Sequence, residues 1–195
     1  MRALVAVIGV VFIPILHAAD AVSELPVEIK ATISEKGYSS AKGELEAYVK
    51  SNPESYSGYS ALGKATAFDG DYKQSIDYFE QAKEIKEHRN IPDASIYNSI
   101  GWVKFLNGDT QGAIVDIETA IKKKDELDPK VAEAALNNLG LIYMYSNQGD
   151  KAKENFDKAV SDYGSEYARD NLVLMNNLEK NREWQANDTG VDDPK

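Results

Sequence analysis

The side chains that could bind a metal ion or carry acid–base chemistry are few and scattered in this chain. Cysteine is absent, and the two histidines are His17 and His88. Without a thiolate or a second imidazole beside the first, the sequence offers no zinc site and no catalytic thiol. His88 stands in a run of charged residues, which is typical of a solvated side chain. We therefore expect no metal site.

One short stretch of sequence does suggest a cation-binding site. Asp69-Gly70-Asp71 has the alternating oxygen ligands of a calcium loop, but such a loop also needs a distant bidentate glutamate. Reduced forms of the string recur as Asn107-Gly108-Asp109 and Gln148-Gly149-Asp150. A turn between two helices explains all three strings, because glycine tolerates a left-handed conformation and aspartate caps the next helix. The pattern favours a repeated interhelical turn, and we expect no cofactor.

The acidic residues do not form a catalytic pair. Glu44 and Glu46, like Asp116 and Glu118, stand two residues apart, so on a helix they do not face each other. No glycine-rich phosphate loop is present. The net charge is −10 and no basic stripe stands out, which argues against a nucleic-acid partner and against docking on anionic lipid. The sequence predicts a protein that is not an enzyme and has no catalytic residue.

The elements that would position these residues follow an internal repeat. Leu62, Ile100 and Leu139 are 38 and 39 residues apart, and a glycine follows each of them. Three further series keep the same spacing: Ser75, Ala113 and Ala152; Phe79, Ile117 and Phe156; Ala82, Ala120 and Ala159. This pattern predicts pairs of antiparallel helices. Glycine on the first helix lets the second approach, a small residue meets it there, and the large residue fills the space between repeats.

This pattern resembles the tetratricopeptide repeat, with its aromatic-x2-Leu-Gly-x2-Tyr segment, Gly-Asp turn and following Ala, aromatic and Ala. The match covers about residues 56–162, with Thr66 and Lys104 where tyrosine is expected and Ser75 where alanine is expected. The resemblance implies an all-α, right-handed superhelical solenoid of antiparallel helix pairs. It would contain three clear repeats, one degenerate N-terminal repeat and a C-terminal capping helix.

The flanks of the repeats complete the predicted organisation. Residues 20–55 are expected to form the degenerate N-terminal helix pair, with Ile29 and Ile33 on its first helix. Residues 56–162 hold the three repeats. Residues 163–185 are expected to form the capping helix, because a solenoid must cover its last apolar face. The acidic tail, residues 186–195, is expected to be disordered.

The N-terminus predicts export. Met1-Arg2 supplies a positive start, Ala3 to Leu16 is apolar, and small residues follow up to Ala21. This order is typical of a secretory signal peptide, here residues 1–19, with cleavage after Ala19 or after Ala21. An uncleaved anchor is the alternative. No cysteine follows the apolar run, so no lipid anchor is expected. The predicted location is periplasmic or secreted.

The resemblance also implies where a partner would bind. In this family the concave surface is lined mainly by first helices, and partners lie there as extended or helical peptides. Carrying those positions over gives a peptide-binding groove of Lys64, Phe68, Asn98, Trp102, Phe105, Asn137, Leu141, Met144 and Tyr145. The aromatic residues would be anchors, and the asparagines could hydrogen-bond a bound backbone. Alternatively, the capping helix fills the groove with Tyr167, Leu172 or Trp184.

The sequence therefore predicts an adaptor or scaffold that binds a protein or peptide partner in the bacterial cell envelope. The family's clamp for a chaperone's C-terminal carboxylate is not matched, because Ser60 and Lys64 stand at its positions in the first repeat. The alternative function is a structural module that self-assembles into a homo-oligomer.

Overall fold

The computed structural model describes residues 24–188, with side chains described up to residue 180. The predicted signal peptide, residues 1–19, and residues 189–195 of the predicted tail lie outside this range. Within the described residues every regular element is a helix and no strand is present, which confirms the predicted all-α fold. No helix in this range is long and apolar enough to cross a membrane.

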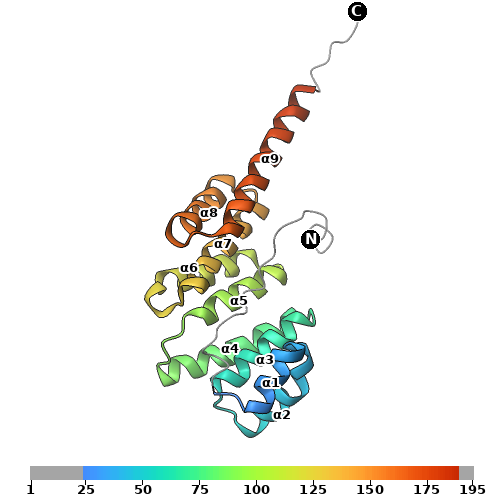
Figure 1. The fold of residues 1–195 in the computed structure, drawn as a ribbon, viewed down its shortest axis with the longest axis vertical. Coiled ribbons are helices and arrows are strands. Elements are labelled where there is room, and N and C mark those ends of the chain that lie inside the picture. The colour runs from blue at the N-terminus through green and yellow to red at the C-terminus, as the bar shows by residue number, and fades with distance from the viewer. Residues whose placement is uncertain (1–23, 189–195) are drawn as a thin grey trace, which may run out of the picture.

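The helices follow one another in pairs along an elongated array (Figure 1). In chain order they are α1 (Val27–Lys36), η2 (Ser39–Ala41), α2 (Lys42–Ser51), α3 (Tyr56–Phe68), α4 (Tyr72–Arg89), α5 (Ser95–Leu106), α6 (Thr110–Lys122), η3 (Lys124–Glu126), α7 (Pro129–Tyr145), α8 (Gly149–Tyr163) and α9 (Glu166–Asp188).

Three helix pairs correspond to the three predicted repeats. The most extensive packing joins α3 to α4, α5 to α6, and α7 to α8, and the next joins the second helix of one pair to the first helix of the next. Because each pair contacts mainly its neighbours, the molecule is a solenoid (Figure 1).

The turns inside the first two pairs form as the sequence predicts. The side chains of Asp71 and Asp109 each accept a hydrogen bond from the backbone N–H three residues later, at 3.1 and 2.9 Å. These bonds satisfy one of the free N–H groups at the start of α4 and α6. The preceding Gly70 and Gly108 have φ of 81° and 97°, a left-handed conformation that glycine adopts without strain.

The third turn is built differently from the prediction. The residue with positive φ there is Asn147 (φ 59°), and Gly149 is already the first residue of α8. Gly70, Gly108 and Asn147 are 38 and 39 residues apart, so the structural repeat keeps its spacing through this turn. Aligning Gly149 with the earlier glycines was therefore wrong by two residues. Asparagine takes the left-handed position because its short polar side chain tolerates it.

The helix–helix spacing inside each pair depends on the repeated glycine. A Cβ added to Gly63 would lie 2.7 Å from the ring of Phe79, and one added to Gly140 would lie 2.5 Å from the ring of Phe156. Gly101 has the same relation to its partner helix, with the nearest side-chain atom at 2.6 Å. The predicted close approach of the two helices is thus present in all three repeats.

The buried core consists of three successive clusters. The first lies within residues 25–78 and joins α1, α2 and α3. The second lies within residues 56–127, and the third lies within residues 102–175 and includes α9. The sequence range of each cluster overlaps that of the next, and every cluster is built from residues of neighbouring helices.

The two ends of the described chain are also helical. The segment predicted as a degenerate repeat contains α1 and α2, which bury Ile29, Leu45 and Val49. At the other end α9 packs on α8 and α7 and buries Ala168 and Met175. The helix α9 continues to Asp188, beyond residue 185 where the capping helix is predicted to end.

Candidate functional site

The predicted groove residues all lie on the first helices of the three repeats, α3, α5 and α7. We call this set the inner face. Its members are Lys64 and Phe68 of α3, Asn98, Trp102 and Phe105 of α5, and Asn137, Leu141, Met144 and Tyr145 of α7.

An aromatic cluster occupies the α5 and α7 part of the inner face. The ring centroids of Trp102 and Phe105 are 5.5 Å apart, and those of Phe105 and Tyr145 are 6.0 Å apart. Both separations are favourable for aromatic pairs. Phe105 is buried, whereas Trp102, Met144 and Tyr145 are partly exposed. The structure therefore brings four of the predicted residues together and leaves three of them accessible.

The two inner-face asparagines are buried and already bonded to neighbouring helices. Asn138 donates its amide to Oδ1 of Asn98 at 3.2 Å, and Asn171 of α9 donates to Oδ1 of Asn137 at 2.9 Å. The carbonyl oxygens of Asn98 and Asn137 thus link α5 to α7 and α7 to α9. In the described part of the chain, the Nδ2 group of Asn137 is buried without a hydrogen-bond partner. This donor is therefore unused within the described residues.

The α3 part of the inner face has a different character. Lys64 is buried, and its Nζ lies 5.4 Å from the centre of the Tyr38 ring. The same ring stacks on Phe68 with centroids 6.2 Å apart, and Phe68 is half exposed. Burial lowers the pKa of Lys64 to about 8, and the negative charge of Asp93 partly opposes this shift. The sequence analysis did not predict that Tyr38, from the N-terminal helical segment, would contact Lys64 and Phe68.

Not every predicted groove residue is accessible. Leu141 belongs to the same buried cluster as Phe105 and Met175 of α9. The capping helix therefore covers part of the α7 inner face, while Met144 and Tyr145 stay partly exposed. The structure lies between the open and the filled groove that the sequence allows. No observation tests whether a peptide binds these residues, and their role stays a prediction.

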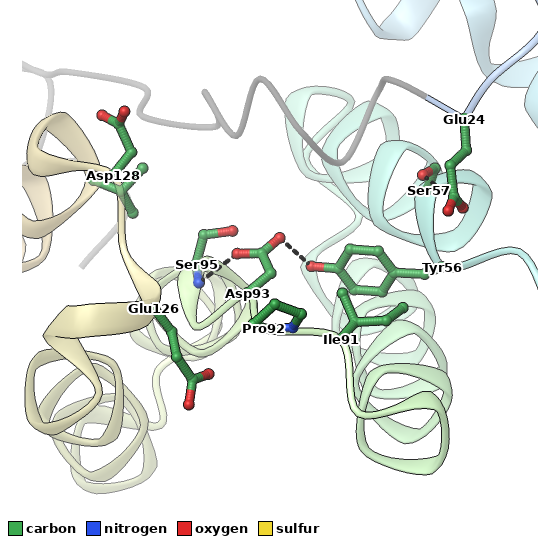
Figure 2. A pocket seen from close by; sticks show the side chains of 10 residues that line it. Glu24, Tyr56, Ser57, Ile91, Pro92, Asp93, Ser95, Glu126 and Asp128 are labelled. Carbon is green, nitrogen blue, oxygen red and sulfur yellow. Dashed lines mark hydrogen bonds between the residues drawn. The ribbon is translucent and has the colours of Figure 1, made fainter.

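A pocket of about 280 Å³ lies at the N-terminal ends of α3 and α5. Figure 2 shows Asp93 in its centre, where it accepts hydrogen bonds from the Tyr56 hydroxyl at 2.6 Å and from the Ser95 backbone N–H at 2.9 Å. Burial, and next the charge of Asp93, raise the pKa of Tyr56. Tyr56 therefore stays protonated and serves as a donor to Asp93.

The same pocket carries other carboxylates that sequence reasoning missed. Glu24 pairs with Arg89 at 3.6 Å, and Glu126 pairs with Lys86 at 3.5 Å. Glu126 and Asp128 lie on the opposite side of Asp93 from Tyr56 in Figure 2, and the Asp128 carboxylate points away from Asp93. The sequence signal for this pocket was weak, because Asp93, Glu126 and Asp128 come from connections between helices whose course depends on the lengths of the preceding helices.

The described residues contain no group of three or more His, Asp or Glu side chains that could hold a metal ion. The Asp69-Gly70-Asp71 string lies at the α3–α4 turn, where Asp71 caps α4.

Comparison with known families agrees with this geometry. A family profile described as "Tetratricopeptide repeat" matches residues 56–89 and 133–161, which are α3–α4 and most of α7–α8. The chain belongs to the tetratricopeptide-repeat (TPR) family. Its middle pair, α5–α6, lies outside the two matched ranges but has the same packing of Gly101 on the second helix.

Two curated relatives extend this result. The TPR protein is 32% identical to Tetratricopeptide repeat protein 36 of Danio rerio over 114 residues, which is 58% of each chain. It is 30% identical to Photosystem I assembly protein Ycf3 of Rippkaea orientalis (strain PCC 8801 / RF-1) over 127 residues, covering 63% of this chain and 69% of that protein. The match spans little more than half the length of the first of these relatives.

Solved structures show the same fold. MamA superposes with a TM-score of 0.59 at 18% identity, over 84% of this chain and 98% of that one. A thermophilic TPR protein of Thermus thermophilus superposes with a TM-score of 0.60 at 18% identity, over 75% of this chain and 77% of that one. At this identity the likeness is one of fold alone. The chain thus has the repeat architecture of the TPR family, whose members typically bind other proteins.

Proposed function

We propose that this TPR protein is exported to the bacterial cell envelope and there binds a segment of a protein partner on its inner face, as an adaptor or scaffold. The observation that carries the proposal is the aromatic cluster. Trp102 and Tyr145 lie on successive first helices, are joined through the buried ring of Phe105, and are both partly exposed. Large aromatic side chains held in place by a packed core are typical binding anchors.

A test by capture follows from this cluster. Residues 20–195 are used as bait on an envelope extract, beside the double variant Trp102→Ala, Tyr145→Ala. We expect the wild-type bait to hold a partner protein that the double variant loses, with the helix content of the variant unchanged by circular dichroism. Retention of the same partner by both baits would show that the inner face is not the binding surface.

Site-specific cross-linking gives a second test in living cells. A photoreactive benzoylphenylalanine is placed at Met144 on the inner face, and in a matched control at Val115, which is 54% exposed on the second helix α6. We expect a cross-linked partner from position 144 and not from position 115. Cross-links to the partner from both positions alike would contradict the proposal. A cross-link only to a second copy of this chain would favour self-assembly.

The export part of the proposal rests on residues 1–19 and has its own test. Fractionation of cells, with N-terminal sequencing of the isolated protein, should find it outside the cytoplasm with Asp20 or Val22 as its first residue. Recovery from the cytoplasm with residues 1–19 intact would refute export.

A further inference from the structure

A second pocket lies between the last two repeats, and we call it the α6–α8 pocket. It has a volume of about 380 Å³ and is lined by residues of α6, α7 and α8. Its floor is apolar and consists of the partly buried Ile121 and the buried Leu136 and Leu139. Charged side chains of α6 and α8 form its rim. The volume lies in the range of about 300–1,000 Å³ that is usual for ligand pockets.

The α6–α8 pocket uses a different side of α7 from the inner face. Leu139 and Tyr143 line the pocket, whereas Asn137, Leu141 and Met144 belong to the inner face. Because an α-helix has about 3.6 residues per turn, the two sets are centred roughly 140° apart around its axis. A segment bound in the pocket would therefore leave the inner face free.

The rim of the pocket carries cations that the protein itself does not pair. Lys158 pairs with Glu154 at 2.7 Å. Lys122 and Lys151, both exposed, have no carboxylate partner in the part of the chain that the structure describes. The Nζ of Lys151 instead lies 5.0 Å from the centre of the Tyr143 ring. Two positive charges therefore stand beside an apolar floor.

The two carboxylates on the same rim are already engaged. Glu118 accepts a hydrogen bond from the hydroxyl of Tyr143 at 3.2 Å, and Glu154 accepts one from Lys158. The charges that remain available at the pocket are thus positive, although the whole chain has a net charge of −10. The Asp93 pocket has the opposite character, because a carboxylate occupies its centre. This local reversal of charge favours an acidic ligand.

The separation of the two available lysines favours a chain segment as that ligand. Lys151 contacts the ring whose hydroxyl bonds Glu118, and Lys122 follows Glu118 by one helical turn, about 6 Å. A small anion or a lipid headgroup presents its charge at one point. An extended segment advances about 3.3 Å per residue, so it can present two carboxylates two or three residues apart.

We propose that the α6–α8 pocket binds an acidic segment of a second protein, with an apolar side chain on its floor and carboxylates paired with Lys122 and Lys151. Both ion pairs are exposed, so each contributes modestly to affinity and together they select for acidic sequences. The inference does not rest on binding at the inner face. If both surfaces are used, one chain holds two partners on different sides of the same repeat.

The test is selection from a library of random twelve-residue peptides, displayed between two folded domains so that side chains supply its only carboxylates. The target is expressed from its full sequence and purified in the form in which the cell leaves it. Selection is repeated on the double variant Lys122→Gln, Lys151→Gln. The matched control is Lys73→Gln, Lys153→Gln, which removes two exposed lysines that do not line the pocket. Circular dichroism confirms that each variant is folded.

We expect wild type and the control to enrich peptides with two acidic residues two or three positions apart beside a large apolar residue. The variant without Lys122 and Lys151 should not enrich them. For a selected peptide, replacing both acids by their amides should weaken binding to wild type about fivefold or more and leave binding to that variant unchanged. Binding to wild type should also weaken as the salt concentration rises.

The same selection on Trp102→Ala, Tyr145→Ala separates the pocket from the inner face. Acidic peptides retained by this variant support the inference, and acidic peptides lost from it would overturn the inference. Equal enrichment by wild type and by the variant without Lys122 and Lys151, or no acidic peptide from wild type, would also overturn it. The proposed function would stand in these last two cases, because it depends on the inner face.

Two further measurements examine other occupants of the pocket. Analytical ultracentrifugation would reveal a dimer of wild type that Lys122→Gln, Lys151→Gln dissociates, which would make a second copy of this chain the occupant. Sedimentation with phosphatidylglycerol vesicles would reveal a lipid surface as the occupant if wild type binds them and this variant does not. Either result would overturn the proposal of an acidic protein segment. A wild-type monomer that leaves the vesicles unbound supports it.

Discussion

The inner face of this TPR protein has two halves with different chemistry on one scaffold. At α3 it presents a buried ammonium group, Lys64, beside the stacked rings of Tyr38 and Phe68. At α5 and α7 it presents the aromatic cluster centred on Phe105. The helix pairs beneath the two halves are nevertheless built alike, because the glycine and the large residue that set their spacing meet between the two helices of each pair. The packing residues and the residues of the proposed binding surface therefore occupy different positions of the same repeat.

The largest expected effect tests whether the scaffold really is shared by the two halves. Gly63→Ala and Gly140→Ala should each lower the free energy of unfolding by about 2 kcal/mol, because the added methyl meets an aromatic ring that cannot yield without shifting a helix. Denaturant unfolding followed by circular dichroism measures both. Gly43→Ala is the control, since its Cβ would meet nothing within 4 Å and alanine favours the helix. A loss at one site only would show that the two pairs are built differently.

The second prediction concerns the cation that distinguishes the α3 half. Because the pKa of Lys64 falls from 10.5 to about 8 on folding, the unfolded chain holds this proton more tightly between those values. Stability contributed by Lys64 therefore rises with pH across this window. Lys64→Met should be more stable than wild type at neutral pH. The difference in the free energy of unfolding between the two proteins should become smaller by on the order of 2 kcal/mol between about pH 7 and 9.5.

Paired unfolding titrations of the two proteins isolate this effect from other groups. Tyr38, which faces Lys64, has its pKa raised by burial, so it affects stability only near and above its ordinary range. Asp93 is common to both proteins. A stability difference that stays constant from pH 7 to about 9.5 would refute the buried, desolvated state of Lys64.

A third, smaller effect concerns the links between helices in the α5–α7 half. Asn171→Ala removes the hydrogen bond to Asn137 and leaves the buried carboxamide of Asn137 with no partner on either side. We expect a loss of about 1–2 kcal/mol in the free energy of unfolding. Asn176→Ala, at an exposed position of the same helix, should have little effect. Equal stability of the two variants would show that α9 does not depend on this bond.

The smallest expected effect distinguishes a tyrosine hydroxyl without a hydrogen-bond partner from one that has a partner. Tyr145→Phe removes a buried hydroxyl without a partner and should leave the protein as stable or stabilise it by up to about 1 kcal/mol. Tyr143→Phe removes the hydrogen bond to Glu118 and should destabilise by about 1 kcal/mol. Thermal unfolding of the two variants compares them. A loss in both would mean that the Tyr145 hydroxyl is bonded in solution.

The fold was predictable because its determinants repeat. Gly63 and Phe79 have equivalents in each pair at constant spacing, and their contact requires two helices at close range. Residue identity was less reliable than spacing as a guide to the turns. The Gly149-Asp150 string led to an alignment of the third turn that the positive φ of Asn147 corrects. An asparagine can replace the turn glycine, so the turn is defined by its distance from its equivalents.

The site was predictable only in part, because accessibility depends on neighbours that the repeat pattern does not specify. Spacing placed Trp102 and Lys64 on one surface, but it could not show that Tyr38 covers Lys64. It also could not show that α9 buries Leu141 or occupies the carbonyl oxygen of Asn137. These contacts come from the degenerate repeat and the capping helix, whose sequences depart most from the pattern.

The division of the core into three overlapping clusters has a consequence for how the chain acquires its structure. Each cluster is assembled from residues close in sequence, within 25–78, 56–127 and 102–175. Contacts of this kind close short loops and give a low contact order, which speeds folding. The first cluster can form as soon as the chain to residue 78 is available, and each later cluster then grows on a surface that already exists. An error in the last pair is therefore confined to its own end of the array.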